Sequence, residues 1–173
     1  TVLAIAQLSL TDAGGQRRLA GVDLSVRAGE IVGVAGVEGN GQRELVRAIA
    51  GLEPRASGTI AIAGRDLTGS DVRARRPVLG VVHEDRQIEG LLLDATTGDN
   101  LILGDLGDAP AGFAEGATFS RRIERFRIHP TDPSRLAGEL SGGNQQKIVL
   151  ARALDRLKQG ERAAVVLAQP TRG

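Results

Sequence analysis

The segment that decides the fold reads Leu140-Ser141-Gly142-Gly143-Asn144-Gln145-Gln146-Lys147. It leads into an apolar-faced run, residues 148–154, whose spacing predicts a helix. Ser141 is placed to cap that helix with its hydroxyl, and two glycines without Cβ let backbone N–H groups approach a ligand closely. Free amides at the positive end of a helix dipole predict an anion site. The alternative interpretation of the same residues is a capped surface helix without a ligand.

Composition limits the function classes. The chain has 173 residues, enough for one domain with a hydrophobic core. Its 22 basic and 21 acidic residues give a net charge of +1, which argues against nucleic acid or an anionic membrane surface as a partner. The absence of cysteine excludes disulfides and thiolate metal sites. Apolar runs at 31–37 and 163–168 are too short to span a bilayer, and no signal peptide is visible at Thr1, so we expect a reducing, cytosolic compartment.

Apolar patterning predicts a mixed α/β chain. Two loosely alternating segments, Val2–Leu10 and Val22–Val26, flank a glycine-containing turn and are predicted to be antiparallel neighbours. A further strand covers 57–64. Short continuous apolar runs are typical of strands buried on both faces of a parallel sheet, and the chain has three of them, at 31–35, 78–82 and 163–167.

Helices are predicted between and after these strands. One covers 44–50 and ends at Gly51, and a short basic one runs to Arg76 from a cap at either Ser70 or Asp71. We expect the arginines of the second helix to form a solvated face. A third helix covers Phe119–Arg127, after a stretch without periodicity at 103–118, and Gln159-Gly160 is predicted to end the helix that follows the opening segment.

The glycine-rich loop at 36–43 lies between a predicted strand and a predicted helix, as a phosphate-binding P-loop does, and its glycines fit Gly-x-x-x-x-Gly. The lysine position holds Gln42, which carries no charge, and the Ser/Thr position holds Arg43, which cannot ligate a cation. A charge-assisted hydrogen bond is worth about 1.5–3 kcal/mol, so phosphate affinity should fall tenfold or more without the lysine. Two alternatives stay open: an ordinary strand-to-helix turn, and Arg43 as a substitute phosphate clamp.

The opening segment resembles the signature motif of ATP-binding-cassette (ABC) proteins, in the form typical of the ATPase subunits of simple-sugar and nucleoside importers. The glycine loop, His83-Glu84-Asp85-Arg86 and Pro170-Thr171-Arg172-Gly173 follow the family's order, so the resemblance covers the whole chain. It implies an α/β P-loop NTPase cassette with a parallel-sheet core, an antiparallel β subdomain and a helical signature subdomain at about 87–157. We expect residues 1–173 to be a single nucleotide-binding domain, the second (C-terminal) cassette of its subunit, incomplete at the C-terminus.

The resemblance also implies roles for individual residues. Family cassettes place Asp, for Mg²⁺, and then Glu, the base for water, after the third strand, where this chain has Ala168 and Gln169. We therefore expect a degenerate site with no metal of its own, with Mg²⁺ only at the partner cassette's ATP. His83 replaces a family proline and could do acid–base work. Expected nucleotide-binding residues are Gly36, Glu38, Gly39, Asn40, Gly41, Gln42, Arg43 and Glu84, and those expected to close over the partner's ATP are Ser141, Gly142, Gly143, Asn144 and Gln145.

The function implied is ATP-driven import of nucleosides or simple sugars at the cytoplasmic face of a bacterial membrane. Implied partners are a first cassette or a second ATPase subunit, transmembrane permease subunits and, indirectly, an extracytoplasmic solute-binding protein, without nucleic acid. The isolated domain is expected to hydrolyse ATP weakly or not at all. Two other functions stay open: a non-hydrolysing regulatory or dimerisation cassette, and a soluble non-transport ABC ATPase.

Overall fold

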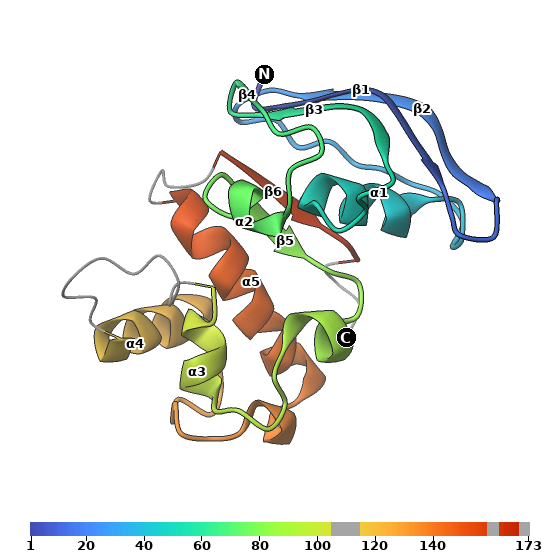
Figure 1. Ribbon diagram of the computed structural model, residues 1–173. Helices are drawn as coiled ribbons and strands as arrows, with labels where there is room; N and C mark the ends of the chain where they lie inside the picture. Colours follow the sequence, from blue (N-terminus) through green and yellow to red (C-terminus); the bar gives the residue numbers. More distant parts are fainter. Residues whose placement is uncertain (105–114, 159–162, 170–173) are drawn as a thin grey trace. The chain divides into compact units, whose positions relative to one another are not determined.

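A computed structural model describes residues 1–104, 115–158 and 163–169 (Figure 1). The chain divides into two compact units. Unit 1 contains Thr1–Val81 and the later residues 163–168, and unit 2 contains the described residues of Val82–Lys158 together with Gln169. The predictions made for 105–114, for Gln159-Gly160 and for the Pro-Thr-Arg-Gly segment lie outside the described residues.

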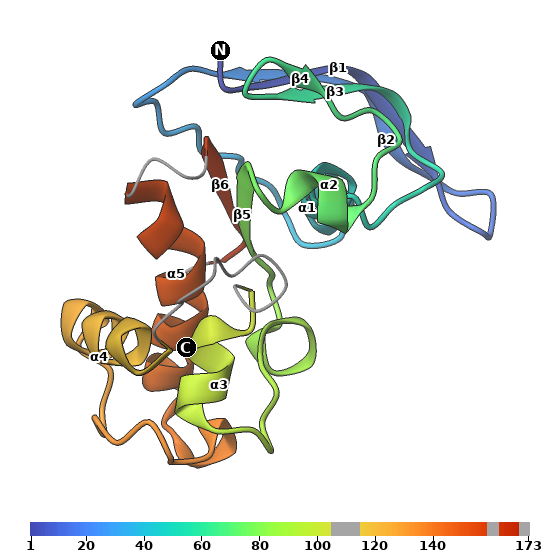
Figure 2. The ribbon, with the colours of Figure 1, turned by 60° about the vertical axis from the view of Figure 1, so that its left-hand side comes forward.

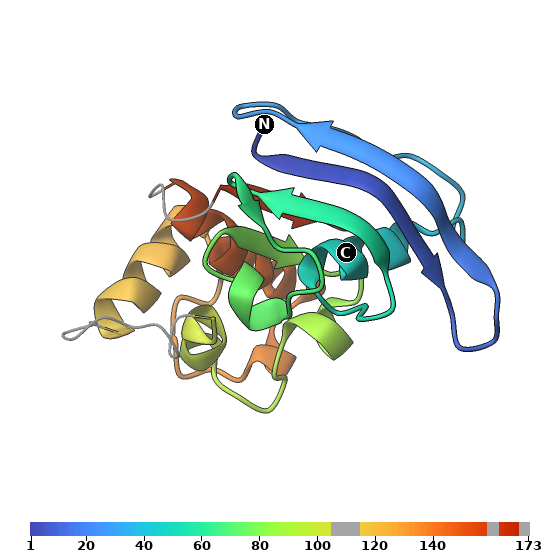
Figure 3. The same cartoon turned by 45° about the horizontal axis from the view of Figure 1, so that its top comes forward.

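Unit 1 is built on a four-stranded antiparallel sheet in the order β2-β1-β3-β4 (Figure 3). The turn between its first two strands is fixed by Asp12, whose Oδ1 accepts hydrogen bonds from the amides of Gly14 and Gln16, both at 2.9 Å. This arrangement confirms the predicted antiparallel neighbours and the predicted strand after residue 56. The strands are β1 (Leu3–Thr11), β2 (Arg17–Val26), β3 (Ser57–Ile62) and β4 (Arg65–Asp66).

The core of unit 1 lies between this sheet and helix α1 (Gln42–Ala50). Every second residue along β3 points inward, so Ile60 and Ile62 are buried, and they pack with Leu45 and Ile49 of the helix. The helix ends at Gly51, as predicted, because the left-handed φ of 84° lets the Gly51 amide satisfy a last-turn carbonyl.

Two further strands, β5 (Leu79–Val82) and β6 (Ala164–Leu167), form a second sheet. The amide of Ala163 donates to the Val78 carbonyl at 2.9 Å, and Ala164 and Val166 pack on the same core. These are the strands predicted at 78–82 and 163–167.

The third run predicted as a buried strand, 31–35, is not a strand in the structure, and the prediction is wrong. Ile31 is 97% exposed and Val34 is 57% exposed. A β-branched apolar run becomes a strand only where a neighbouring strand supplies its hydrogen bonds. Among the described residues, the second sheet consists of β5 and β6 alone and does not extend to this run.

The prediction that the arginines of the short basic helix form a solvated face is also wrong for one residue. Helix α2 (Val72–Arg75) begins at the predicted Asp71 cap, but Arg75 is 4% exposed. Its guanidinium donates to the carbonyls of Ala48 at 2.5 Å and Ile49 at 2.8 Å. These carbonyls lie at the C-terminal end of α1, where the helix dipole favours a cation, although burial lowers the pKa of Arg75.

Unit 2 is helical, and in it α3 and α4 both contact α5 (Figure 2). Helix α4 begins four residues before Phe119, the predicted start. Sequence patterning did not predict α3, which begins with a reciprocal capping box between Thr96 and Asp99. The elements are the π-helix η1 (Arg86–Gly90), α3 (Thr97–Ile102), α4 (Glu115–Phe126), the 3-10 helix η2 (Ala137–Glu139) and α5 (Gly142–Lys158).

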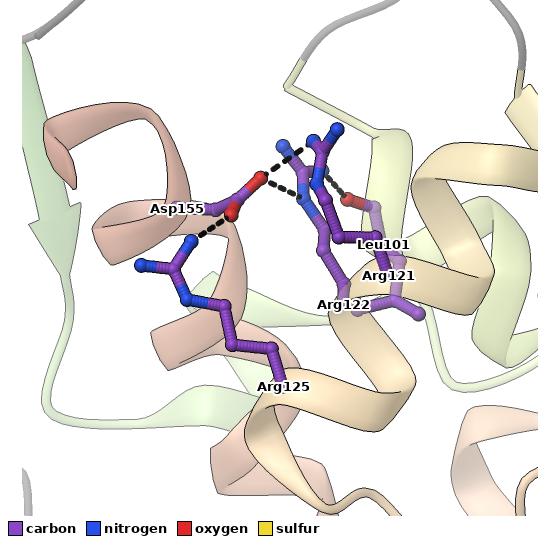
Figure 4. Close-up of polar contacts among 5 residues, drawn as sticks. All are labelled: Leu101, Arg121, Arg122, Arg125 and Asp155. Carbon is purple, nitrogen blue, oxygen red and sulfur yellow. Dashed lines mark hydrogen bonds and ion pairs between the residues drawn. The ribbon is translucent and has the colours of Figure 1, made fainter. Parts of the chain in front are cut away.

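A buried carboxylate, that of Asp155 on α5, joins these helices (Figure 4). It accepts from Arg121 at 2.8 Å, from Arg122 at 3.1 Å and from Arg125 at 2.5 Å, all on α4. Arg122, only 2% exposed, also donates to the Leu101 carbonyl of α3. Burial opposes ionisation of the carboxyl, but the hydrogen bonds from Arg121 and Arg122 outweigh it and hold the pKa of Asp155 below its ordinary value.

We predict that Asp155→Asn lowers the free energy of unfolding by about 3 kcal/mol at pH 7, because it leaves the buried guanidinium of Arg122 without its counter-charge. Urea denaturation measures this loss. The matched control is Arg135→Gln, which removes an exposed pair with Glu139 and should cost less than about 1 kcal/mol.

The pH dependence of the unfolding free energy follows from the lowered pKa of Asp155. The contribution of Asp155 is fully present above the ordinary aspartate pKa of about 3.9 and is lost as the pH falls through the lower value of the folded state. The difference between the parent protein and Asp155→Asn should therefore shrink in acid. A difference that is constant from neutral pH to strong acid would contradict the assignment.

Candidate functional site

The glycine loop of unit 1 leads into α1 through glycine-specific backbone conformations, although residues 31–35 before it are not the strand that was predicted. Gly39 and Gly41 have φ values of 90° and 95°, a region that favours glycine. A Cβ at Gly41 would lie 2.6 Å from the Arg18 carbonyl oxygen, so only glycine fits where α1 begins. The Gly41 carbonyl accepts a hydrogen bond from the Leu45 amide at 2.8 Å, and this hydrogen bond begins α1. The amides that precede Leu45 in the helix therefore lie at the loop.

The side chain of Gln42 folds back into this loop. Its Nε2 donates to the Val37 carbonyl at 3.2 Å, and a Cβ at Gly36 would overlap the same nitrogen. Arg43 is exposed, as are Glu38 and Asn40. The loop therefore offers helix-dipole attraction and a neutral amide donor, and its interior is partly filled by Gln42. This arrangement fits a phosphate weakly.

The loops that follow β5 and β6 meet through two predicted site residues. Gln169 Nε2 donates to Glu84 Oε1 at 2.8 Å, and Gln169 has a φ of 45°. The position at which the family has its base is thus held by an amide that is hydrogen-bonded to a carboxylate. Sequence patterning did not foresee this pair, because its members lie 85 positions apart.

Mg²⁺ does not fit the residues of this site. The Ala168 methyl group has no donor atom, and the Gln169 amide nitrogen faces Glu84. Among the described residues there is no group of three or more His, Asp or Glu side chains able to hold a metal ion. The hard oxygen ligands that Mg²⁺ prefers are therefore not assembled in the part of the chain that the structure describes.

The signature residues of unit 2 divide into an exposed and a buried set. Ser141 and Gly143 are exposed at the N-terminus of α5, where amides and dipole face outward. The Ser141 hydroxyl accepts from Asn144 Nδ2 at 3.0 Å, and Asn144 Oδ1 accepts from the His129 amide, also at 3.0 Å. Gln145, by contrast, is 3% exposed. This end of the helix is both accessible and anchored.

Gln145 anchors the signature to two other segments. Its Nε2 donates to the Ala137 carbonyl at 3.1 Å, and its Oε1 accepts from Gln87 Nε2 at 3.1 Å. Arg86 Nε approaches the same oxygen at 3.5 Å, and a Cβ at Gly142 would lie 2.5 Å from Arg86 Nη2. Sequence reasoning missed both Arg86 and Gln87. Asp85 was the available signal, since its side chain accepts from the amides of Gln87 and Ile88 at the start of η1.

Comparison with known proteins identifies the family. Residues 19–166 match the sequence profile described as ABC transporter. This chain belongs to the ABC transporter family. It is 38% identical over 180 residues to the nucleoside import ATP-binding protein NupA of Lactococcus lactis, covering 99% of this chain and 35% of NupA. It is 36% identical to the guanosine import ATP-binding protein NupO of Bacillus subtilis, covering 99% of this chain and 34% of NupO.

Ribose importers of the family are similar too. The chain is 39% identical over 158 residues to the ribose import ATP-binding protein RbsA of Lactococcus lactis, covering 88% of this chain and 31% of RbsA. The chain thus spans about a third of the length of these relatives. No helix among its described residues is long and apolar enough to cross a membrane.

Solved structures of the family share the fold. The ATP-binding cassette MJ0796, in a dimeric post-hydrolysis state bound to ADP and Pi, superposes with a TM-score of 0.79 at 18% identity, covering 96% of this chain and 88% of that one. At this identity the likeness concerns the fold alone. The α/β P-loop NTPase cassette fold predicted from the sequence is confirmed.

We predict that Gln169→Glu destabilises the protein by about 0.5 kcal/mol at low salt, because it sets two carboxylates against each other where one hydrogen bond now joins the loops. The loss should shrink in about 1 M salt, which screens charges beyond about 3 Å. Chemical denaturation at two salt concentrations measures both effects. Gln169→Met, which loses the hydrogen bond without adding charge, should show no such salt effect, and a salt-independent loss in the glutamate variant would contradict the contact.

Proposed function

We propose that this chain is an ATP-binding cassette of an importer for nucleosides or simple sugars. In this proposal its own nucleotide site is degenerate, and its signature completes the site of a partner cassette. One observation carries the proposal: the exposed signature end of α5 keeps its anion-binding geometry, while the chain's glycine loop and the loop after β6 have lost the groups that handle phosphate and metal.

The signature half of the proposal rests on the geometry of α5. Ser141 and Gly143 are exposed, and the amides of Gly142, Gly143 and Asn144 precede the first turn's hydrogen bond, which the Gln145 amide donates to the Ser141 carbonyl. The Asn144 side chain is fixed on both sides, by Ser141 and by the His129 amide, so the loop is ordered before any ligand arrives. Preorganised donors of this kind stabilise developing phosphoryl charge by about 2.7–4 kcal/mol each.

The degenerate half rests on four positions at which this chain departs from the family motifs that it resembles. Gln42 provides an amide where a P-loop lysine provides a charge, and Arg43 provides no hydroxyl. Ala168 has no donor atom for a metal ion, and Gln169 has an amide in place of a carboxylate base. An ATP bound at the partner cassette would supply the phosphoryl group that is transferred to water. The residues of this chain would orient that phosphate through backbone amides and exclude water from one side.

The importer assignment rests on the relatives. NupA and NupO are named as import ATP-binding proteins for nucleosides and guanosine, and RbsA for ribose. The chain spans about a third of their length, and its Glu84-Asp85-Arg86 run resembles the motif of second cassettes, so we propose that it is the second of two cassettes in a longer subunit. Its partners would then be the first cassette, membrane permease subunits at the cytoplasmic face and, indirectly, a solute-binding protein.

A regulatory cassette without any role in nucleotide chemistry is the second candidate, and the Gln42 side chain that partly fills the glycine loop favours it. The two proposals differ at the signature. A regulatory module needs the fold of α5 but no open anion site at its end. Variants that block the anion site without unfolding the helix therefore separate them.

We predict that ATP binds the glycine loop of the isolated chain weakly, with an affinity that hardly depends on Mg²⁺. The loop amides and the α1 dipole remain, whereas Arg43 and Ala168 offer the metal no ligand. Calorimetric titration with and without Mg²⁺ measures this. Gln42→Lys, which restores the P-loop charge, should bind about tenfold more tightly, and a tight, strictly Mg²⁺-dependent complex of the parent chain would show that the site is intact.

We predict that Ser141→Arg abolishes ATP turnover in the assembled two-cassette importer, because a long cationic side chain would fill the place of the phosphate. Gln42→Ala should change turnover little, since that site has already lost its lysine. Steady-state ATPase assays of both variants, with thermal melts to check folding, give the comparison.

The asymmetry between these two variants decides among the proposals. Equal losses would indicate two equivalent sites and contradict degeneracy. Normal turnover in both, with the fold intact, would favour the regulatory module. Ser141→Ala serves as the matched control, because it removes the hydroxyl while leaving the backbone amides open to a phosphate.

A further inference from the structure

The segment that carries Arg86 is attached to α5 at two levels. At the helix N-terminus, Gln87 and Arg86 reach the Gln145 side chain. Further along, Arg152 donates to the Gly90 carbonyl, and a Cβ at Gly90 would lie 3.2 Å from Val149 Cγ2. These contacts at two levels pack η1 against α5, with the side chains of one segment lying on small glycines of the other.

The stability of α5 alone does not favour an arginine at the position of Arg86. Its guanidinium lies against Gly142, at the positive end of the α5 dipole. A cation near a helix N-terminus is electrostatically unfavourable, whereas an anion there is attracted. An anion at the signature would be attracted by the amides and by the guanidinium together, so the arrangement suits a bound phosphate better than it suits the helix alone.

The contact with Gln145 gives Arg86 a route to the signature backbone. Gln145 is buried, its amide group is hydrogen-bonded on both its oxygen and its nitrogen, and its own backbone amide donates to the Ser141 carbonyl at 2.9 Å. A side chain fixed in this way transmits a shift at η1 to the first turn of α5. The planar guanidinium can hold the Gln145 oxygen while it covers the small Gly142, which a flexible ammonium group does less well.

We propose that Arg86 is a positioning residue for the signature: it holds the first-turn amides of α5 through Gln145 and the Gly142 backbone. The inference rests on the function proposed above, in which those amides serve the partner cassette's ATP. In this role Arg86 acts by fixing the position of the amides, so its loss should displace them by a fraction of an ångström and slow turnover. Nucleotide binding should weaken less, because the partner cassette's own loop provides most of it.

The test compares four variants in the full two-cassette importer: Arg86→Ala, Arg86→Lys, Arg135→Ala and Ser141→Arg. We expect Arg86→Ala to lower kcat about tenfold with KM for ATP within about twofold of the parent, and Arg86→Lys to recover part of the loss. Arg135→Ala is the matched control, because it removes an exposed arginine of the same unit and should leave turnover unchanged.

A second readout needs no nucleotide. Hydrogen–deuterium exchange of the peptide covering residues 140–147 should accelerate in Arg86→Ala and not in Arg135→Ala. A merely structural role would instead raise exchange throughout unit 2 and lower the melting temperature. If Arg86→Ala does not fold, Arg86→Gln, which keeps a hydrogen-bonding side chain without the charge, takes its place in the same two measurements.

The outcomes separate the two proposals. If Ser141→Arg turns over normally, the proposed function fails, and the role of Arg86 fails with it. If Ser141→Arg is inactive while Arg86→Ala matches Arg135→Ala in kcat and in exchange, the role of Arg86 is overturned and the proposed function stands. A lower kcat together with faster exchange confined to the signature supports both.

Discussion

The buried amide of Gln145 is the interaction on which the presentation of the signature depends. It joins three segments that are distant in the sequence: the start of α5, the turn at Ala137 and the π-helical segment after β5. A buried amide that lost these partners would cost about 1–3 kcal/mol per unsatisfied group. The hydrogen bonds therefore favour one position of the helix N-terminus, in which Ser141 and Gly143 face outward and the anchoring side chains face inward.

We propose opposite roles for the two predicted phosphate-binding elements of the chain. At the signature, backbone amides, a helix dipole and an ordered Asn144 combine into an open donor surface. At the glycine loop, the backbone conformation persists, but the Gln42 amide folds inward where a phosphate would need space. The Gln169–Glu84 hydrogen bond likewise uses the position of a catalytic base for a contact between loops. Retention of one element beside loss of the other is what a cassette would show if it served a partner's nucleotide more than its own.

Local chemistry explains which features could be predicted from sequence. Strands β1 and β2, the Gly51 stop of α1 and the Asp71 cap follow from alternation and capping, which depend on neighbouring residues. The run at 31–35 failed because a strand needs hydrogen bonds from a partner that the run itself does not specify. Arg75 and Arg86 were misjudged or missed because their roles depend on groups far along the chain, the carbonyls of Ala48 and Ile49 for the first and Gly142 for the second. The family motifs predicted candidate site residues, but not the hydrogen bonds that hold them.

A cysteine cross-link tests most directly whether this signature serves another cassette. The chain contains no cysteine, so Ser141→Cys creates a single reactive thiol in it. A second cysteine would be placed in the glycine loop of the partner cassette, after cysteines elsewhere in the assembly are replaced. A disulfide requires Cα atoms within about 7 Å, so its formation reports close approach. We predict rapid cross-linking between the cassettes that ATP accelerates; no cross-link with ATP, or one formed equally well to a cysteine in this chain's own loop at Gly39, would contradict the account.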